Sequence, residues 1–136
     1  MKNKDHLLDT NVLLFFLEDS PRLPEQLAQM IESPASRSYI SLASLWEIAI
    51  KASLGKLQVD YANRDDLPEL LQSMGFHLIK PDWESMRRAA YLPFHHRDPF
   101  DRLLVAECQI RNYPILSCDA QLDAYSISRV WRCGEV

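Results

Sequence analysis

The stretch His6-Leu7-Leu8-Asp9-Thr10-Asn11-Val12-Leu13-Leu14 sets the pattern for the whole chain. A short apolar run ends at an acidic residue, Asp9, and a helical segment then follows from Asn11 to Glu18. The combination of an apolar strand with a closing acid recurs where Ile115-Leu116-Ser117-Cys118 ends at Asp119. Strands that alternate with helices predict a parallel sheet with helices on its faces.

The rest of the chain continues this alternation, so we expect one α/β domain over residues 1–136. Its architecture should be a three-layer α/β/α arrangement around a short central parallel sheet of about four to five strands. Further strands are expected over residues 39–42, 76–79, 115–118 and 129–132, and helices over residues 23–33, 45–54, 65–74, 82–90 and 99–112.

The composition is that of an ordinary soluble domain, with 47% hydrophobic and 25% charged residues. No apolar run approaches the ~20 residues of a membrane helix, and no signal segment precedes Leu7, so we expect a cytoplasmic protein. The net charge of −4 argues mildly against a protein that coats nucleic acid non-specifically. Bound cations would, however, reverse the electrostatic influence of acids gathered at a metal site. Cys108, Cys118 and Cys133 are widely spaced, which predicts buried reduced thiols and neither a zinc site nor disulfides.

Four acids stand where strands end or helices begin, and each has a structural explanation. Ser44-Leu45-Trp46-Glu47 fits a capping box, with Glu47 in the first helical turn. Asp98-Pro99-Phe100-Asp101 places an N-cap, a proline at the first helical position and an acid at the third. Asp9 and Asp119 are also placed to cap the segments that follow them.

The four acids taken together favour a second interpretation. In a parallel sheet the functional crevice lies outside the carboxyl ends of the strands, and Asp9, Glu47, Asp101 and Asp119 can all point to that edge. Crowded carboxylates raise one another's pKa, so a divalent cation is needed to keep them ionised. The sequence therefore predicts a metal-dependent enzyme that acts on phosphate.

Four stretches of the chain resemble PIN-domain ribonucleases, specifically the VapC-type toxins of bacterial toxin–antitoxin pairs. They are Leu7 to Leu14, Ser44 to Lys51, His96-Arg97-Asp98-Pro99-Phe100-Asp101-Arg102-Leu103-Leu104 and Leu116 to Asp119, and the resemblance extends from about Leu7 to Trp131.

The resemblance implies a role for each matching residue. Asp9, Glu47, Asp101 and Asp119 match the acids that hold magnesium or manganese. Asn11 matches a polar residue that steadies the first aspartate, and Ser117 matches a small hydroxyl position beside the last. Such toxins form homodimers, cleave RNA and are held inactive by a cognate antitoxin protein.

This set suits Mg²⁺ or Mn²⁺, because such ions prefer oxygen ligands. We expect Asp9 to be the central ligand, Asp101 and Asp119 to complete the shell, and Glu47 to bind directly or through water. Metal-activated water would then hydrolyse the phosphodiester bond of RNA by in-line displacement, with one ion or two. The family's chemistry implies products with 5′-phosphate and 3′-hydroxyl ends.

Several other residues carry weaker predictions. Arg97 and Arg102 can contact RNA phosphate or pair with nearby acids, and Lys51 can join a basic rim. Adjacent side chains diverge, so His95 and His96 are expected to pack in a loop or to border the substrate, and not to bind metal. Trp46 and Tyr91 are expected in the core or at a dimer interface. The helix over residues 21–33 offers Leu23, Leu27 and Ile31 to an antitoxin groove or to the core.

Two rival functions remain open. One is a phosphotransfer or phosphatase-type α/β protein with Asp9 as nucleophile, although such enzymes commonly need an acid where Asn11 stands. The other is a catalytically inactive PIN-like interaction module. An idle carboxylate cluster would cost stability without metal, which argues against that module.

Overall fold

A computed structural model describes residues 4–131 and shows a sheet of five parallel strands in the order β3-β2-β1-β4-β5. The strands are β1 (Asp5–Leu8), β2 (Arg37–Ser41), β3 (His77–Ile79), β4 (Ile115–Leu116) and β5 (Arg129–Val130). All four pairings are parallel. The expected three-layer α/β/α class with a short parallel sheet is therefore confirmed.

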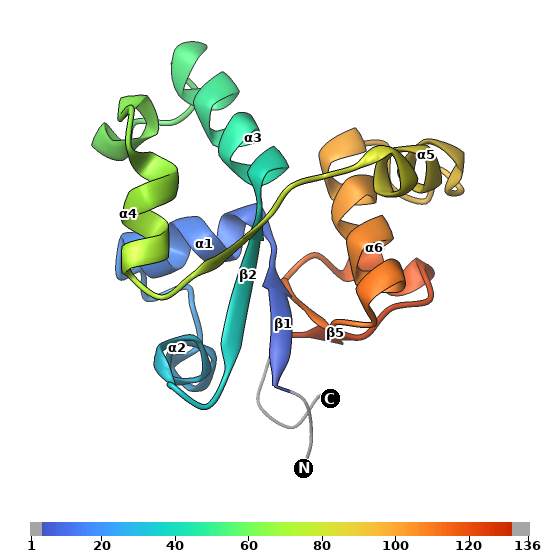
Figure 1. The fold of residues 1–136 in the computed structure, drawn as a ribbon, viewed down its shortest axis with the longest axis horizontal. Helices are drawn as coiled ribbons and strands as arrows, with labels where there is room; N and C mark the ends of the chain where they lie inside the picture. The colour runs from blue at the N-terminus through green and yellow to red at the C-terminus, as the bar shows by residue number, and fades with distance from the viewer. Residues whose placement is uncertain (1–3, 132–136) are drawn as a thin grey trace.

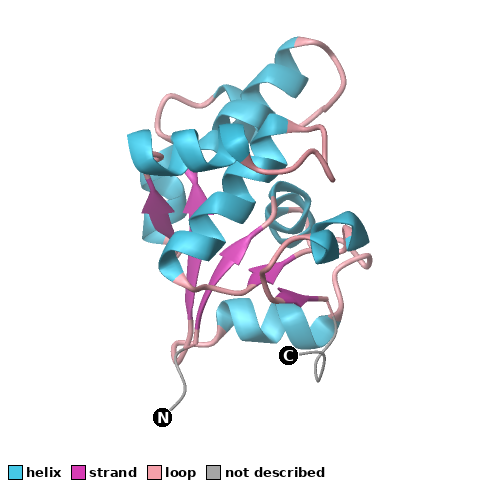
Figure 2. Ribbon diagram, turned by 90° about the vertical axis from the view of Figure 1, so that its right-hand side faces the viewer, coloured by secondary structure: helices cyan, strands magenta, loops and turns pink. Residues whose placement is uncertain are grey.

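Helices cover both faces of the sheet (Figures 1 and 2). In Figure 1, α1 to α4 lie on one side of β1 and β2, and α5 and α6 lie together on the other. The α-helices are α1 (Thr10–Leu17), α2 (Glu25–Glu32), α3 (Leu42–Ser53), α4 (Leu67–Ser73), α5 (Trp83–Tyr91) and α6 (Pro99–Arg111), and two short 3-10 helices are η1 (Asp60–Asn63) and η2 (Ala120–Ala124).

The central strands are buried on both faces, because successive side chains of a strand point to opposite sides. Leu7 of β1 and Ile115 of β4 pack in the core beneath α6. Leu8 and Leu116, one residue farther along each strand, pack in the core beneath α1 to α4. Leu7 and Leu8 thus pack into two different cores. Asp9, the next residue, stands at the carboxyl edge of the sheet.

Helix α3 begins three residues earlier than the sequence pattern predicts. Ser41 is its N-cap and accepts a hydrogen bond from the backbone N–H of Ala43 at 3.1 Å. The predicted capping box of Ser44 and Glu47 is therefore wrong, and Glu47 lies in the second turn. The helix ends as expected near Gly55, whose φ of +73° favours glycine.

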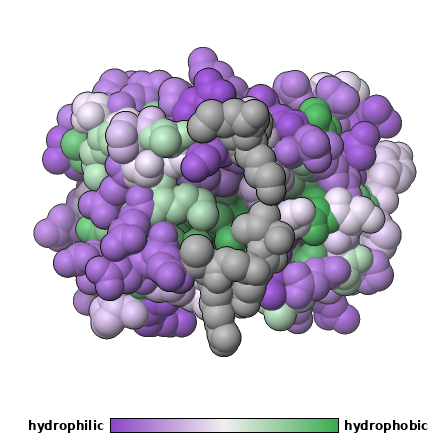
Figure 3. Space-filling model, turned by 90° about the horizontal axis from the view of Figure 1, so that it is seen from below, coloured by the Kyte–Doolittle hydropathy of each residue, from purple (hydrophilic) through white to green (hydrophobic). Residues whose placement is uncertain are grey.

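The expectation that the cysteines are buried holds for one of the two that the structure describes. Cys108 is buried as expected, Cys118 is exposed against expectation, and Cys133 lies outside the described residues. Over residues 4–131, no helix combines the length and apolar character needed to cross a membrane. The face below the strands' amino ends is largely hydrophilic where it can be seen in Figure 3.

Candidate active site

Two strand ends place the first pair of acids side by side. Asp9 directly follows β1, Asp119 follows β4, and these neighbouring strands pair Leu8 with Leu116. Ser117 joins the two acids, because its hydroxyl donates to Asp9 Oδ2 at 2.6 Å and accepts from the Asp119 backbone N–H at 3.0 Å. A small hydroxyl residue directly after β4 thus links the Asp9 carboxylate to the backbone of Asp119.

Both acids also cap the segments that follow them, as the sequence suggested. Asp9 Oδ1 accepts from the Thr10 backbone N–H at 2.7 Å, and Asp119 Oδ1 accepts from the Gln121 backbone N–H at 3.0 Å. The capping and site interpretations are therefore compatible, since each carboxylate uses one oxygen for its cap. Asn11, expected to steady Asp9, is exposed on α1, and the Asp9 carboxylate accepts hydrogen bonds from Thr10 and Ser117.

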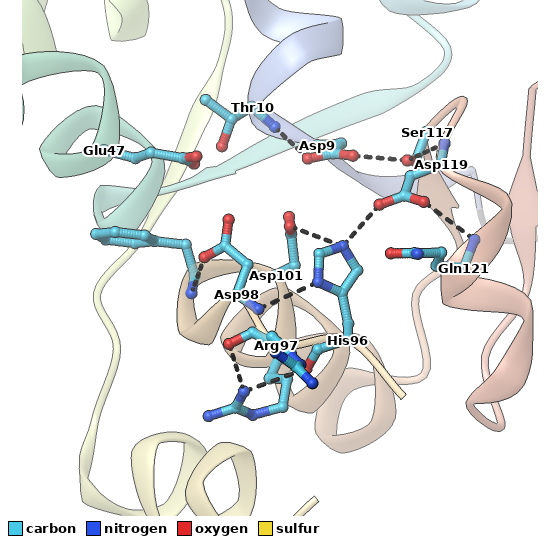
Figure 4. A network of polar contacts seen from close by, with 12 residues as sticks. Asp9, Thr10, Glu47, His96, Arg97, Asp98, Asp101, Ser117, Asp119 and Gln121 are labelled. Atoms are coloured by element: carbon cyan, nitrogen blue, oxygen red, sulfur yellow. Dashed lines mark hydrogen bonds and ion pairs between the residues drawn. The ribbon is translucent and has the colours of Figure 1, made fainter. Parts of the chain in front are cut away.

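Glu47 reaches the same edge from α3 (Figure 4). Its side chain is buried, and Oε2 pairs with the Lys51 ammonium at 3.0 Å. Within the described residues, Oε1 is buried without a hydrogen-bond partner. A buried carboxylate oxygen with no donor is costly, so this atom is a place where a ligand would be stabilising.

Asp101 enters from the first turn of α6, whose N-terminus has the predicted form. Asp98 is the N-cap, accepts from the Phe100 backbone N–H at 2.9 Å, and is followed by Pro99. In a capping box the third residue would bond back to the N-cap N–H. Here the Asp98 N–H instead donates to His96 Nδ1 at 3.2 Å, and the Asp101 carboxylate faces the site.

His96 lies between two of the acids, which the sequence interpretation did not foresee. Its Nε2 is 2.8 Å from Asp119 Oδ2 and 3.1 Å from Asp101 Oδ2 (Figure 4). One ligand-type atom from each of these three residues lies within 4.8 Å of the others. His95 points elsewhere and packs edge-on against the Tyr125 ring. The motif His-Arg-Asp-Pro could have predicted this position, because the side chain of a histidine two residues before an N-cap residue can accept the backbone N–H of that residue.

The site holds more negative charge than its surroundings neutralise. Burial, together with the charges of Asp9, Asp98 and Glu47, raises the pKa of Asp101 to about 8. Burial also raises the pKa of Asp9, helped by Glu47 and Asp119 and opposed by the hydrogen bonds from Ser117 and Thr10. Protons or a cation are therefore needed to bring these carboxylates together.

The three basic residues proposed for substrate contact lie in different surroundings. Arg102 is buried, and its guanidinium donates to the backbone carbonyls of Ala89, His96 and Arg97 at 2.9–3.3 Å. It therefore fixes the loop before α6, and all three of these hydrogen bonds go to carbonyls and none to an acid. Arg97 is exposed. Partial burial lowers the pKa of Lys51, but the hydrogen bond and the charge of Glu47 raise it, and the net shift is upward.

The donor set fits a divalent metal ion. Asp9, Glu47, Asp101 and Asp119 offer carboxylate oxygens from four different elements to one edge of the sheet. Oxygen-rich sites of this kind suit Mg²⁺ or Mn²⁺. The unpartnered Oε1 of Glu47 and the raised pKa of Asp101 are the two features that such an ion would relieve.

An apolar groove borders the acids on one side, between α3, α5 and α6. It has a volume of about 610 Å³, and its lining includes Trp46, Ile50, Met86 and Phe100. Trp46 is 65% exposed and packs edge-on against Phe100 with ring centroids 5.5 Å apart. Trp46 therefore does not lie in the core, and its expected place at a dimer interface stays a prediction. Tyr91 is also exposed, at 84%.

Residues 6–127 match the model of the PIN domain family. The fold also resembles chains in solved structures at low sequence identity. For the toxin–antitoxin complex from Klebsiella pneumoniae, identity is 16%, the match covers 92% of this chain and 95% of that one, and the TM-score is 0.63. For VapBC2 from Rickettsia felis, bound to a promoter DNA fragment, identity is 13%, the match covers 93% of this chain and 97% of that one, and the TM-score is 0.67. For FitAcB from Neisseria gonorrhoeae, identity is 18%, the match covers 90% of this chain and 94% of that one, and the TM-score is 0.63. In sequence, the chain matches no curated protein.

Proposed function

This chain belongs to the PIN domain family, and from the site that its fold assembles we propose that it is a metal-dependent endoribonuclease. We further propose that it is the toxin of a toxin–antitoxin pair. The fold that it shares with solved structures supports this, because one of them is the toxin–antitoxin complex from Klebsiella pneumoniae. The substrate would be RNA, and the cofactor Mg²⁺ or Mn²⁺.

One observation carries the nuclease proposal: four carboxylates lie at one edge of the sheet, yet the fold leaves part of their charge unsatisfied. Glu47 Oε1 is buried without a partner among the described residues, and the pKa of Asp101 is raised to about 8, chiefly by burial. A site built only for stability would pair these groups or replace them with apolar residues. A bound divalent cation satisfies both at once.

A bound divalent ion would supply charge neutralisation at the scissile phosphate and a water of lowered pKa. Asp9, Asp101 and Asp119 would hold it, and Glu47 would bind it directly or through water. The caps and Ser117 keep Asp9 and Asp119 oriented before any ligand arrives. Lys51 and the exposed Arg97 remain as candidates for phosphate contact at the rim.

Cleavage of structured RNA by the purified chain tests this proposal. We expect cleavage with Mg²⁺ or Mn²⁺, 5′-phosphate products, and no cleavage in excess chelator. Asp9→Asn and Asp101→Asn should abolish it, whereas Glu69→Gln, an exposed acid on α4, should not. Full activity in chelator, or in either aspartate variant, would refute the mechanism.

We propose a cognate antitoxin and a second copy of the chain as partners in a cytoplasmic protein. Leu23, which precedes α2, and Leu27 of α2 are 7% and 0% exposed and belong to the core, so neither side chain is available to an antitoxin.

A further inference from the structure

We propose that His96 is a positioning residue: its Nε2–H holds Asp119 by a hydrogen bond beside Asp101, which contacts the same nitrogen, and the imidazole is not itself a metal ligand. The inference rests on the proposed function, because it assumes that these carboxylates bind a divalent ion. The loop before α6 would then arrange two ligands from different elements, Asp101 of α6 and Asp119 after β4.

The hydrogen bonds around the imidazole determine which nitrogen carries the proton. The Asp98 backbone N–H donates to Nδ1 at 3.2 Å, so Nδ1 must be an acceptor. In a neutral imidazole the hydrogen is then on Nε2, where it donates to Asp119 Oδ2 at 2.8 Å, and Asp101 Oδ2 lies 3.1 Å from the same nitrogen. Binding a metal at Nε2 would move the hydrogen to Nδ1 and set it against the Asp98 N–H. The tautomer therefore favours a donor and disfavours a ligand.

The backbone that carries His96 is held on both sides. The buried guanidinium of Arg102 donates to the carbonyls of His96 at 3.2 Å and Arg97 at 2.9 Å. The Tyr125 hydroxyl accepts from the His96 N–H at 3.0 Å and donates to the Pro93 carbonyl at 2.6 Å. The His96 side chain is only 13% exposed. Such a clamped loop delivers the imidazole in one orientation, as an orienting partner of ligands requires.

The arrangement also explains why Asp101 does not close a capping box. His96 Nδ1 takes the N-cap N–H that Asp101 would otherwise accept, and the Asp101 carboxylate instead lies 3.1 Å from His96 Nε2. The metal would consequently meet carboxylate oxygens and no imidazole nitrogen. Such a ligand set selects Mg²⁺ or Mn²⁺ over softer ions such as Zn²⁺.

Three variants and Mn²⁺ as the probe test the inference. His96→Gln keeps an N–H donor near the position of Nε2, His96→Leu removes it, and His95→Gln is a matched control on the neighbouring histidine. We expect His96→Leu to bind Mn²⁺ about 10–100-fold more weakly by calorimetry. His96→Gln and the control should bind nearly as the wild type does. Equal affinity of His96→Leu and wild type would overturn the inference.

Two spectroscopic measurements on the wild type keep the inference testable even if His96→Leu does not fold. Electron spin echo spectroscopy of the Mn²⁺ form should show no imidazole nitrogen coupling. A coupling that disappears in His96→Gln would make His96 a ligand and refute the inference. In the metal-free protein, ¹⁵N NMR should show a protonated Nε2 and an unprotonated Nδ1, and the reverse would also refute it. A wild type that binds no Mn²⁺ would instead refute the proposed function.

Discussion

The carboxylate cluster predicts an unusual dependence of stability on pH in the metal-free protein. Burial, with Asp9, Asp98 and Glu47 nearby, raises the pKa of Asp101 from 3.8 to about 8. Between these values the folded state binds a proton that the unfolded state does not. The free energy of unfolding should therefore rise as the pH falls from 8 toward 4, and this contribution should be lost as the pH rises through 8.

The size of the effect follows from a single proton. For a folded pKa of about 8, lowering the pH from 8 to 6 adds roughly 2 kcal/mol to the free energy of unfolding. For a chain of this length that is roughly 8 °C in melting temperature. His6 works in the opposite direction below about pH 6.5, because burial lowers its pKa. The useful quantity is therefore the difference between the wild type and Asp101→Asn, in which His6 is unchanged.

Thermal melts of both proteins in chelator at pH 8, 7 and 6 measure this difference. We expect the wild type to gain stability relative to Asp101→Asn as the pH falls, and the variant to be as stable as the wild type, or more so, at pH 8. Parallel pH profiles would show that Asp101 stays ionised, and the reasoning would fail. In a second set of melts, Mg²⁺ at a hundredfold excess over Kd should stabilise the wild type by about 2.7 kcal/mol and the variant much less. A variant that melts several degrees lower yet keeps the full Mg²⁺ shift would make Asp101 a structural residue and not a metal ligand.

Two more predictions concern the cell and the loop before α6. Expression of the wild type should arrest growth unless an antitoxin is co-expressed, whereas Asp9→Asn should be tolerated; abundant wild-type protein in an unimpeded culture would remove the toxin assignment. Arg102→Met should lower the free energy of unfolding by at least about 2 kcal/mol in a denaturant titration, because it leaves buried carbonyls without donors, while the exposed Arg97→Met should change it by less than about 0.5 kcal/mol. Unchanged stability of Arg102→Met, with weakened RNA binding, would return Arg102 to a substrate role.

The order of the elements and the place of the acids could be predicted from the sequence, because both depend on local patterns. A strand buried on both faces is a continuous apolar run, so Leu7 and Leu8 mark β1, and the residue that follows, Asp9, must stand at the carboxyl edge. The Asp98-Pro99 start of α6 is similarly local, since capping depends on residues only a few positions apart.

Only the tertiary structure decided what the residues around the acids do. Ser41 and not Ser44 begins α3, because β2 runs directly into the helix, and the Ser44 hydroxyl instead accepts from Thr10 of α1. Arg102 is adjacent to Asp101 in the sequence but points to backbone carbonyls, and His96 joins acids that are 5 and 23 positions away. Hydrogen-bond partners of this kind depend on the path of a loop through space, and no periodicity or capping rule contains that path.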